Sequence, residues 1–149
     1  MKRFVFPLQF MVEANQRTER DLQIELARLR NHHEELAKAE LELLERIEKA
    51  RQNWQERLMA GSGGRILMHY NQIFTLLRRE LAEQQWAVRV AEQQVDQCQD
   101  RLHEVLRDLE ALTLLRQAQQ AQHDLAVQQE KDREMDEFVA CHHKKGELA

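Results

Sequence analysis

The chain has 149 residues, a formal net charge of −4, and only one proline and four glycines. This composition is typical of long helices, because a globular domain with many elements needs turn residues at many places. No basic stripe marks a phosphate-binding surface, so nucleic acid is not expected as a partner. No apolar run reaches the roughly 20 residues that a membrane-spanning helix needs.

The first element is a helix predicted over about residues 4–59, because its apolar positions recur at alternating steps of four and three. Pro7 is compatible with this helix only in the first turn, where its missing N–H costs nothing. One series comprises Leu8, Asn15, Leu22, Leu29, Leu36, Leu43 and Ala50, and the interleaved series comprises Val12, Glu19, Leu26, His33, Glu40, Ile47 and Trp54.

A turn follows at residues 61–64, where Gly61-Ser62-Gly63-Gly64 supplies positions for positive φ. The second helix is predicted over about 65–140, with a frayed tail at 141–149. Its apolar pattern fades after Leu115. Its two seam series are Leu67, Phe74, Leu81, Val88, Val95, Leu102 and Leu109, and Tyr70, Leu77, Gln84, Ala91, Cys98, Val105 and Leu112.

Together these elements predict an all-α fold over residues 1–149: an antiparallel coiled-coil hairpin whose second helix is longer and overhangs the first. Folding at the glycines places Trp54 level with Tyr70 and Leu43 level with Leu81. Residues beyond about 121 then have no partner in the same chain. We expect the isolated chain to be a monomer.

Catalytic chemistry is not expected, because no nucleophile elbow, phosphate loop or dinucleotide fingerprint occurs. Adjacent helical residues point about 100° apart, so His32 and His33 cannot share one ion. Cys141-His142-His143 lacks a second ligand set, so a metal-binding regulator is the least favoured of the alternatives. No metal or other cofactor is predicted. Cys98 and Cys141 lie too far apart on one helix to form a disulfide, which favours reduced thiols in the cytoplasm.

Three segments are candidate surfaces for another protein. One follows the turn and the other two lie near the chain ends. They are Met68, Tyr70, Ile73, Phe74 and Leu77; Phe4, Phe6, Phe10 and Met11; and Met135-Asp136-Glu137-Phe138. The segment after the turn could instead be extra core, and the segment near the end of the second helix could instead be a solvated tail. The aromatic side chains at the start of the first helix could form a hydrophobic staple, but three of them exceed what a staple needs.

The same segments resemble the FliJ family of bacterial flagellar type III export. The resemblance rests on the order of three motifs: Phe4-x-Phe6-x-Leu8, Tyr70-x-x-Ile73-Phe74-x-x-Leu77 and Lys131-x-x-x-Met135-Asp136-Glu137-Phe138. It implies a soluble, non-catalytic cytoplasmic component that resembles the central stalk of rotary ATPases and lies at the inner face of the cell membrane through its partners.

The partners that the resemblance implies are the hexameric export ATPase, the cytoplasmic domain of the export gate, and export chaperones. Its implied ATPase-binding residues are Phe4, Phe6, Met135, Asp136 and Phe138. Its implied gate-binding residues are Leu43, Ile47, Trp54, Tyr70, Ile73 and Leu77. Without the resemblance, the sequence is also compatible with a different function, that of a generic coiled-coil scaffold or adaptor that homodimerises through the same seams.

Overall fold

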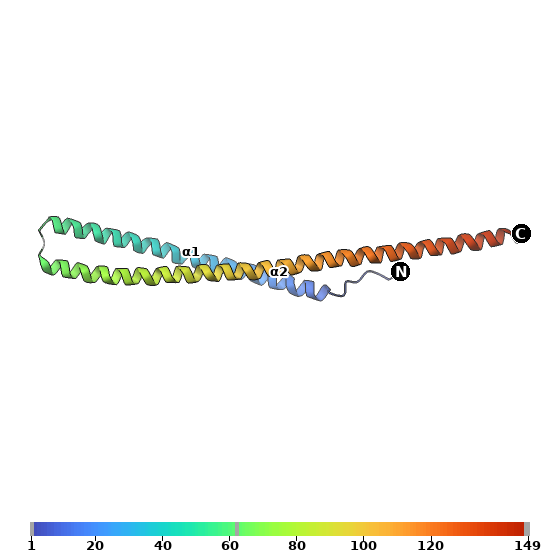
Figure 1. Ribbon diagram of the computed structural model, residues 1–149, viewed down its shortest axis with the longest axis horizontal. Coiled ribbons are helices and arrows are strands. Elements are labelled where there is room, and N and C mark those ends of the chain that lie inside the picture. Colours follow the sequence, from blue (N-terminus) through green and yellow to red (C-terminus); the bar gives the residue numbers. More distant parts are fainter. Residues whose placement is uncertain (1, 62, 148–149) are drawn as a thin grey trace. The chain divides into compact units, whose positions relative to one another are not determined.

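A computed structural model describes residues 2–61 and 63–147, and it contains two long helices that pack against each other and, within those ranges, no strand. Helix α1 spans Gln9–Met59 and α2 spans Gly64–Glu147 (Figure 1). The predicted all-α class is confirmed. The chain divides into two compact units, Arg20–His103 and a second unit that joins Met1–Glu19 to Glu104–Ala149. Both helices run through both units, and the expectation of a single domain over 1–149 stays a prediction.

The turn after α1 depends on Gly61, whose φ of +79° lies in the left-handed region. Only glycine adopts this conformation without a steric cost, so Gly61 ends the helix at the position where helices commonly place glycine. The Gly61 amide donates to the Leu58 carbonyl oxygen at 3.2 Å. Gly63 is not helical and Gly64 is already the first residue of α2. Ser62 of the predicted turn lies outside the described residues.

In the unit Arg20–His103, the two helical segments pack side by side in antiparallel order along the predicted seam. All ten predicted α1 positions from Leu22 to Trp54 are buried or half-buried, as are all ten α2 positions from Tyr70 to Leu102. Leu67 is the exception at 45% exposed. Beyond Trp54 the next seam position of α1 is occupied by a charged residue, Arg57.

Three polar contacts between the helices agree with the antiparallel register of this unit. The Cys98 thiol donates to the Leu22 carbonyl oxygen at 3.6 Å, and the Gln84 side-chain amide donates to the Leu36 carbonyl oxygen at 3.0 Å. Arg46 lies 3.9 Å from Glu80 nearer the turn. Residues early in α1 therefore meet residues late in this part of α2, as a hairpin requires.

In the other unit, residues 2–6 are not helical and α1 begins at Gln9, later than the predicted start near residue 4. The reason is Pro7, because the ring of a proline disfavours helical dihedrals at the residue before it. Phe6 precedes Pro7 and is buried at 5% exposed, and the Phe4 ring lies 5.6 Å from the His123 ring. Val127 is half-buried. Coverage of α2 therefore continues past residue 121, where the sequence predicted it to stop.

The end of α2 is helical as far as Glu147, beyond the predicted limit near residue 140. Residues 141–147 contain no proline, and their one glycine, Gly146, lies in the last turn. Lys144 and Lys145 in the last turn suit the negative end of the helix dipole. Of the predicted frayed tail, residues 148–149 lie outside the described residues. No helix in the described part of the chain is long and apolar enough to cross a membrane.

Candidate functional site

An aromatic cluster lies next to the turn, where α1 ends and α2 begins. Trp54 of α1 contacts two rings of α2, with centroid distances of 6.5 Å to Tyr70 and 6.2 Å to Phe74. Arg57 lies over the Tyr70 ring at 6.0 Å. Such tilted and edge-on pairs add about 0.5–1.5 kcal/mol each beyond burial. The contact between Trp54 and Tyr70 agrees with the register that the sequence predicts.

The six predicted gate-binding residues all lie on or beside the seam. Leu43 is buried at 5% exposed, while Ile47, Trp54, Tyr70, Ile73 and Leu77 are half-buried. The Trp54 indole N–H is buried and has no hydrogen-bond acceptor among the described residues. These side chains therefore hold the hairpin together first, and only their outer edges are open to a partner.

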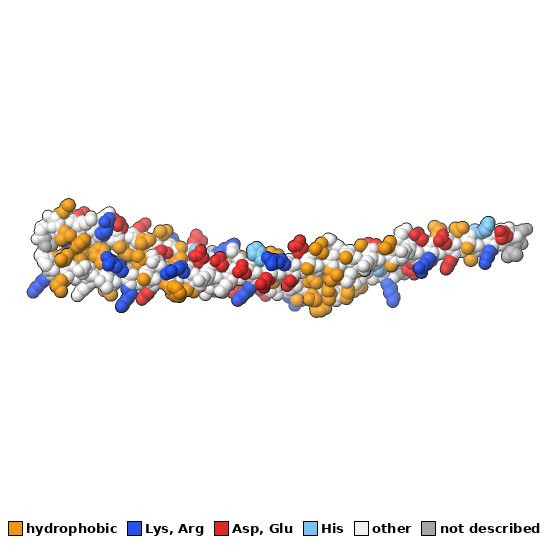
Figure 2. Space-filling model, viewed as in Figure 1, with side chains coloured by type: hydrophobic (Ala, Val, Ile, Leu, Met, Phe, Trp, Pro, Cys, Tyr) orange, Lys and Arg blue, Asp and Glu red, His pale blue; other side chains and the backbone are white. Residues whose placement is uncertain are grey.

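Apolar side chains also gather on the outer surface near this turn (Figure 2). Met68, part of the apolar segment that follows the turn, is exposed. Leu58, Met59 and Leu76 are also exposed, and the sequence pattern does not predict them. Each lies outside the heptad seam, so a search for residues at seam spacing passes over it.

The predicted ATPase-binding residues fall into two groups in the unit that holds both chain ends. Phe4 and Phe6 pack against their own unit, as described above. Met135 and Phe138 are 64% and 60% exposed, and Asp136 between them is exposed. The Phe138 ring stacks on the His142 ring at a centroid distance of 4.5 Å. Every residue from 128 to 147 is exposed.

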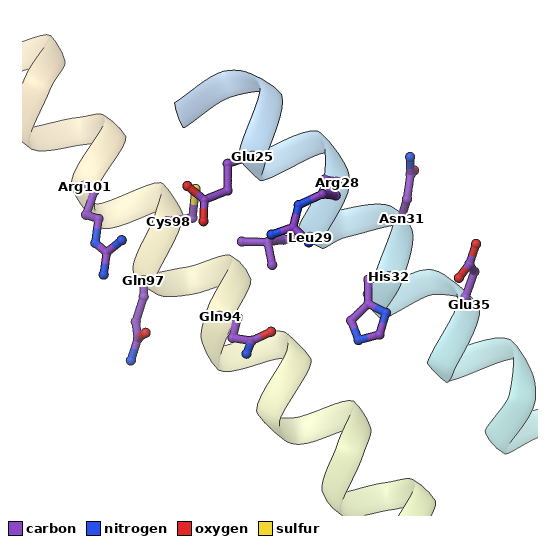
Figure 3. A pocket seen from close by; sticks show the side chains of 10 residues that line it. All are labelled: Glu25, Arg28, Leu29, Asn31, His32, Glu35, Gln94, Gln97, Cys98 and Arg101. Carbon is purple, nitrogen blue, oxygen red and sulfur yellow. The ribbon is translucent and has the colours of Figure 1, made fainter. Parts of the chain in front are cut away.

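A hollow with a largely polar lining lies between the helices of the unit Arg20–His103 and has a volume of about 600 Å³ (Figure 3). Its lining includes two carboxylates and two guanidinium groups, so opposite charges balance. The Cys98 thiol at its edge is buried and donates to the Leu22 carbonyl, which makes it a structural group and not a nucleophile. The charged lining residues are Glu25, Arg28, Glu35 and Arg101.

The histidine and cysteine clusters do not form a metal centre in the part of the chain that the structure describes, where no group of three suitable ligands occurs. His142 is stacked on Phe138, and His143 lies 3.5 Å from Glu147. His33 is half-buried on the seam while His32 is exposed, so the two rings point different ways, as the helical geometry predicts.

The clearest electrostatic perturbation is on an exposed face of α1. The Arg51 guanidinium donates two hydrogen bonds to the Glu48 carboxylate, at 2.7 and 3.1 Å. These bonds, and secondarily the opposite charge, hold the pKa of Glu48 below its usual value. The pair lies on a solvated helix surface and suits helix stabilisation rather than proton transfer.

Comparison with protein families matches the chain to the model described as flagellar FliJ protein over residues 4–147. Comparisons with curated proteins and with solved structures gave no match. The matched range includes both chain-end segments and the aromatic cluster at the turn. Members of this family are non-enzymatic components of flagellar protein export. With nearly its whole length matched, the chain belongs to the FliJ family of flagellar proteins.

Proposed function

We propose that this flagellar export component is a non-catalytic stalk, which enters the hexameric export ATPase ring through the unit that holds both chain ends and promotes assembly of that ring. The observation that supports it most is the uncovered stretch of α2. Residues 128–147 are helical and exposed throughout, and they extend about 30 Å at 1.5 Å per residue. A single helix about 10–12 Å wide fits an opening that excludes a globular domain.

The ATPase-facing contacts in this proposal are Met135 and Phe138, with Asp136 between them. An exposed Met and an exposed Phe near each other are suited to an apolar pocket on a partner, because such residues dominate the energetics of interfaces. Phe4 and Phe6 belong to the same end. Phe6 is buried and the Phe4 ring lies against His123 of α2, so their contribution is to hold the non-helical N-terminal segment in place.

The mechanism that follows is mechanical. A stalk that packs differently against successive ATPase subunits couples their states without any chemistry of its own. A single exposed helix suits this role, because each of its faces presents different side chains. Met135 and Phe138 lie three positions apart and so on neighbouring parts of the helix surface.

The export-gate contact in this proposal lies at the aromatic cluster beside the turn. The outer edges of Tyr70, Ile73 and Leu77 form one side, and Ile47 and Trp54 form the other. Leu43 supports them from inside the seam. The exposed side chains of Met68 and Leu76 extend this surface. Export chaperones would be further partners, and the stalk would lie at the inner face of the cell membrane through these contacts.

The experiment for the ATPase contact is co-sedimentation of the purified chain with the purified export ATPase. We expect Met135→Ala combined with Phe138→Ala to weaken binding by at least about tenfold, since loss of two interface anchors typically costs that much. Leu41→Ala is the matched control, because Leu41 is as exposed as Met135 at 64% but lies in the other unit. Unchanged binding and unchanged ring assembly in the double variant would refute the stalk proposal.

The experiment for the gate contact uses the exposed neighbours first, because the half-buried residues also hold the hairpin. Met68→Ala with Leu76→Ala is expected to weaken binding to the purified gate domain while the helical circular dichroism signal stays unchanged. Tyr70→Ala is then compared at equal helicity. Full binding by both variants would argue against this surface.

A further inference from the structure

A second apolar stripe runs along α2 on the side away from the seam. It consists of Leu114, Ala118, Ala121 and Leu125, which follow one another at steps of four, three and four. This is the spacing of a coiled-coil seam. All four are exposed, with Leu114 and Leu125 each at 60%. The seam face of the same stretch is covered, since Leu112 is buried. Nothing in the described chain packs on the second stripe.

The same spacing continues outward from the stripe to a charged residue at each end, Arg107 on one side and Asp132 on the other. Both are exposed, and neither forms an ion pair with a described residue. The eight positions 107, 111, 114, 118, 121, 125, 128 and 132 read Arg, Ala, Leu, Ala, Ala, Leu, Gln, Asp. Reversed, this order keeps Leu against Leu and the two central alanines against each other, sets Ala111 against Gln128, and sets Arg against Asp.

We propose that this stripe binds a second copy of the chain in antiparallel orientation, centred between Ala118 and Ala121. Leu114 then packs on Leu125 of the second copy, and Ala118 packs on its Ala121. Arg107 meets Asp132 of the second copy at each end of the contact. In an antiparallel coiled coil, residues of one seven-residue series pack against residues of the other. Positions 107, 114, 121 and 128 form one series here and 111, 118, 125 and 132 the other, and each proposed pairing joins the two.

The charges decide the orientation. A parallel second copy in the same register would set Arg107 against Arg107 and Asp132 against Asp132, and like charges facing each other disfavour pairing. The antiparallel copy converts both repulsions into ion pairs. The two alanines at the centre let the helix backbones approach closely, so the leucines on either side reach each other.

The proposed contact between the two copies is short, so the dimer is expected to be weak. Positions 107–132 extend about 39 Å at 1.5 Å per residue, and each copy contributes two leucines. We therefore expect a weak, concentration-dependent dimer, consistent with a monomer in dilute solution. Met135 and Phe138 lie beyond the paired stretch. The pairing uses a different face from the hairpin seam and does not depend on the proposed stalk function.

Sedimentation equilibrium of the full chain over a range from about 10 µM to about 1 mM tests the pairing. We expect association of the native chain, about tenfold weaker association for Arg107→Glu and for Asp132→Arg, and recovery in the double variant. Recovery requires the two positions to face each other across the interface. A chain that stays monomeric at every concentration, or a double variant weaker than either single one, would overturn the proposal.

Disulfide trapping gives a separate readout of orientation, in a Cys141→Ser background because Cys141 is exposed. In the antiparallel pair, residue 114 lies eleven positions, about 16 Å, from residue 114 of the other copy, which is too far for a disulfide. We therefore expect a cross-link only when Leu114→Cys and Leu125→Cys proteins are mixed. Cross-linking of Leu114→Cys to itself would mean a parallel pair and would contradict the proposal. Leu41→Cys serves as the exposed control for random collision.

Discussion

Replacing Leu43 by alanine tests whether the seam of the hairpin runs where the structure places it. Leu43 is 5% exposed, whereas its neighbours Leu41 and Leu44 are 64% and 41% exposed. The three leucines lie within one turn of α1, so they share the same helix propensity and local sequence. Any difference in the loss of unfolding free energy between the three substitutions must therefore come from how far each side chain is covered by α2.

The expected magnitudes follow from the covered surface. Leucine to alanine removes three carbon groups, and at about 0.8 kcal/mol each a buried site loses about 2–3 kcal/mol. This is near the lower end of the range for core leucines, because a two-helix seam can close over part of the space. Leu41 has about a third of its side chain covered, so Leu41→Ala should cost below about 1 kcal/mol. Leu44→Ala should fall between the two.

Urea unfolding followed by tryptophan fluorescence measures these losses. In a Trp86→Phe background Trp54 is the only tryptophan, and it lies in the same unit as Leu43 against Tyr70 and Phe74. The midpoint should fall most for Leu43→Ala with an unchanged denaturant slope. Equal losses at all three leucines, or a larger loss at Leu44, would refute the assignment of the seam.

Three further predictions address the chain end, the turn and the aromatic cluster. Phe6→Ala removes a buried ring, and such truncations cost a few kcal/mol in a core. Amide hydrogen exchange in residues 9–19 should therefore become at least about tenfold faster. Unchanged exchange would mean that Phe6 does not hold this segment. Gly61→Ala should destabilise by about 1–2 kcal/mol in urea unfolding because of its positive φ, although the site has room for a methyl group. Gly64→Ala, in the first turn of α2, is the control and should not destabilise. Trp54→Phe should change unfolding stability by less than about 1 kcal/mol, because the lost indole N–H has no acceptor, whereas Trp54→Ala should cost about 3 kcal/mol or more.

The seam of the hairpin could be predicted from the sequence because its signal is local and repeated. Each predicted position from Leu22 to Trp54 depends only on the step of four or three from its neighbour, and the periodicity of a helix converts that step into a face. Even the polar residues His33 and Glu40, which interrupt the apolar series at seam positions, are half-buried. A single glycine-rich turn then fixed the antiparallel register that brings Trp54 to Tyr70.

The chain end was harder to predict because its packing is not periodic. Phe6 is buried but lies in a non-helical segment, and in such a segment the step between residues does not indicate which side chain is covered. Pro7 gave the relevant signal, since the residue before a proline avoids helical dihedrals. Its consequence, that residues before it would reach as far as His123, depends on contacts distant in sequence.

In a two-stranded coiled coil each helix needs only one covered stripe. Burial on that stripe is explained by the packing of the hairpin and therefore does not by itself indicate a binding site. Leu43 lies on that stripe, so its proposed part in gate binding is indirect. Leu114 and Leu125 do not lie on it, and neither do Met135 and Phe138 beyond them. The hairpin gains nothing from these four side chains, and large exposed apolar residues in a regular row indicate contact with another molecule. The exposed face of α2 is therefore where substitutions should alter binding without altering the fold.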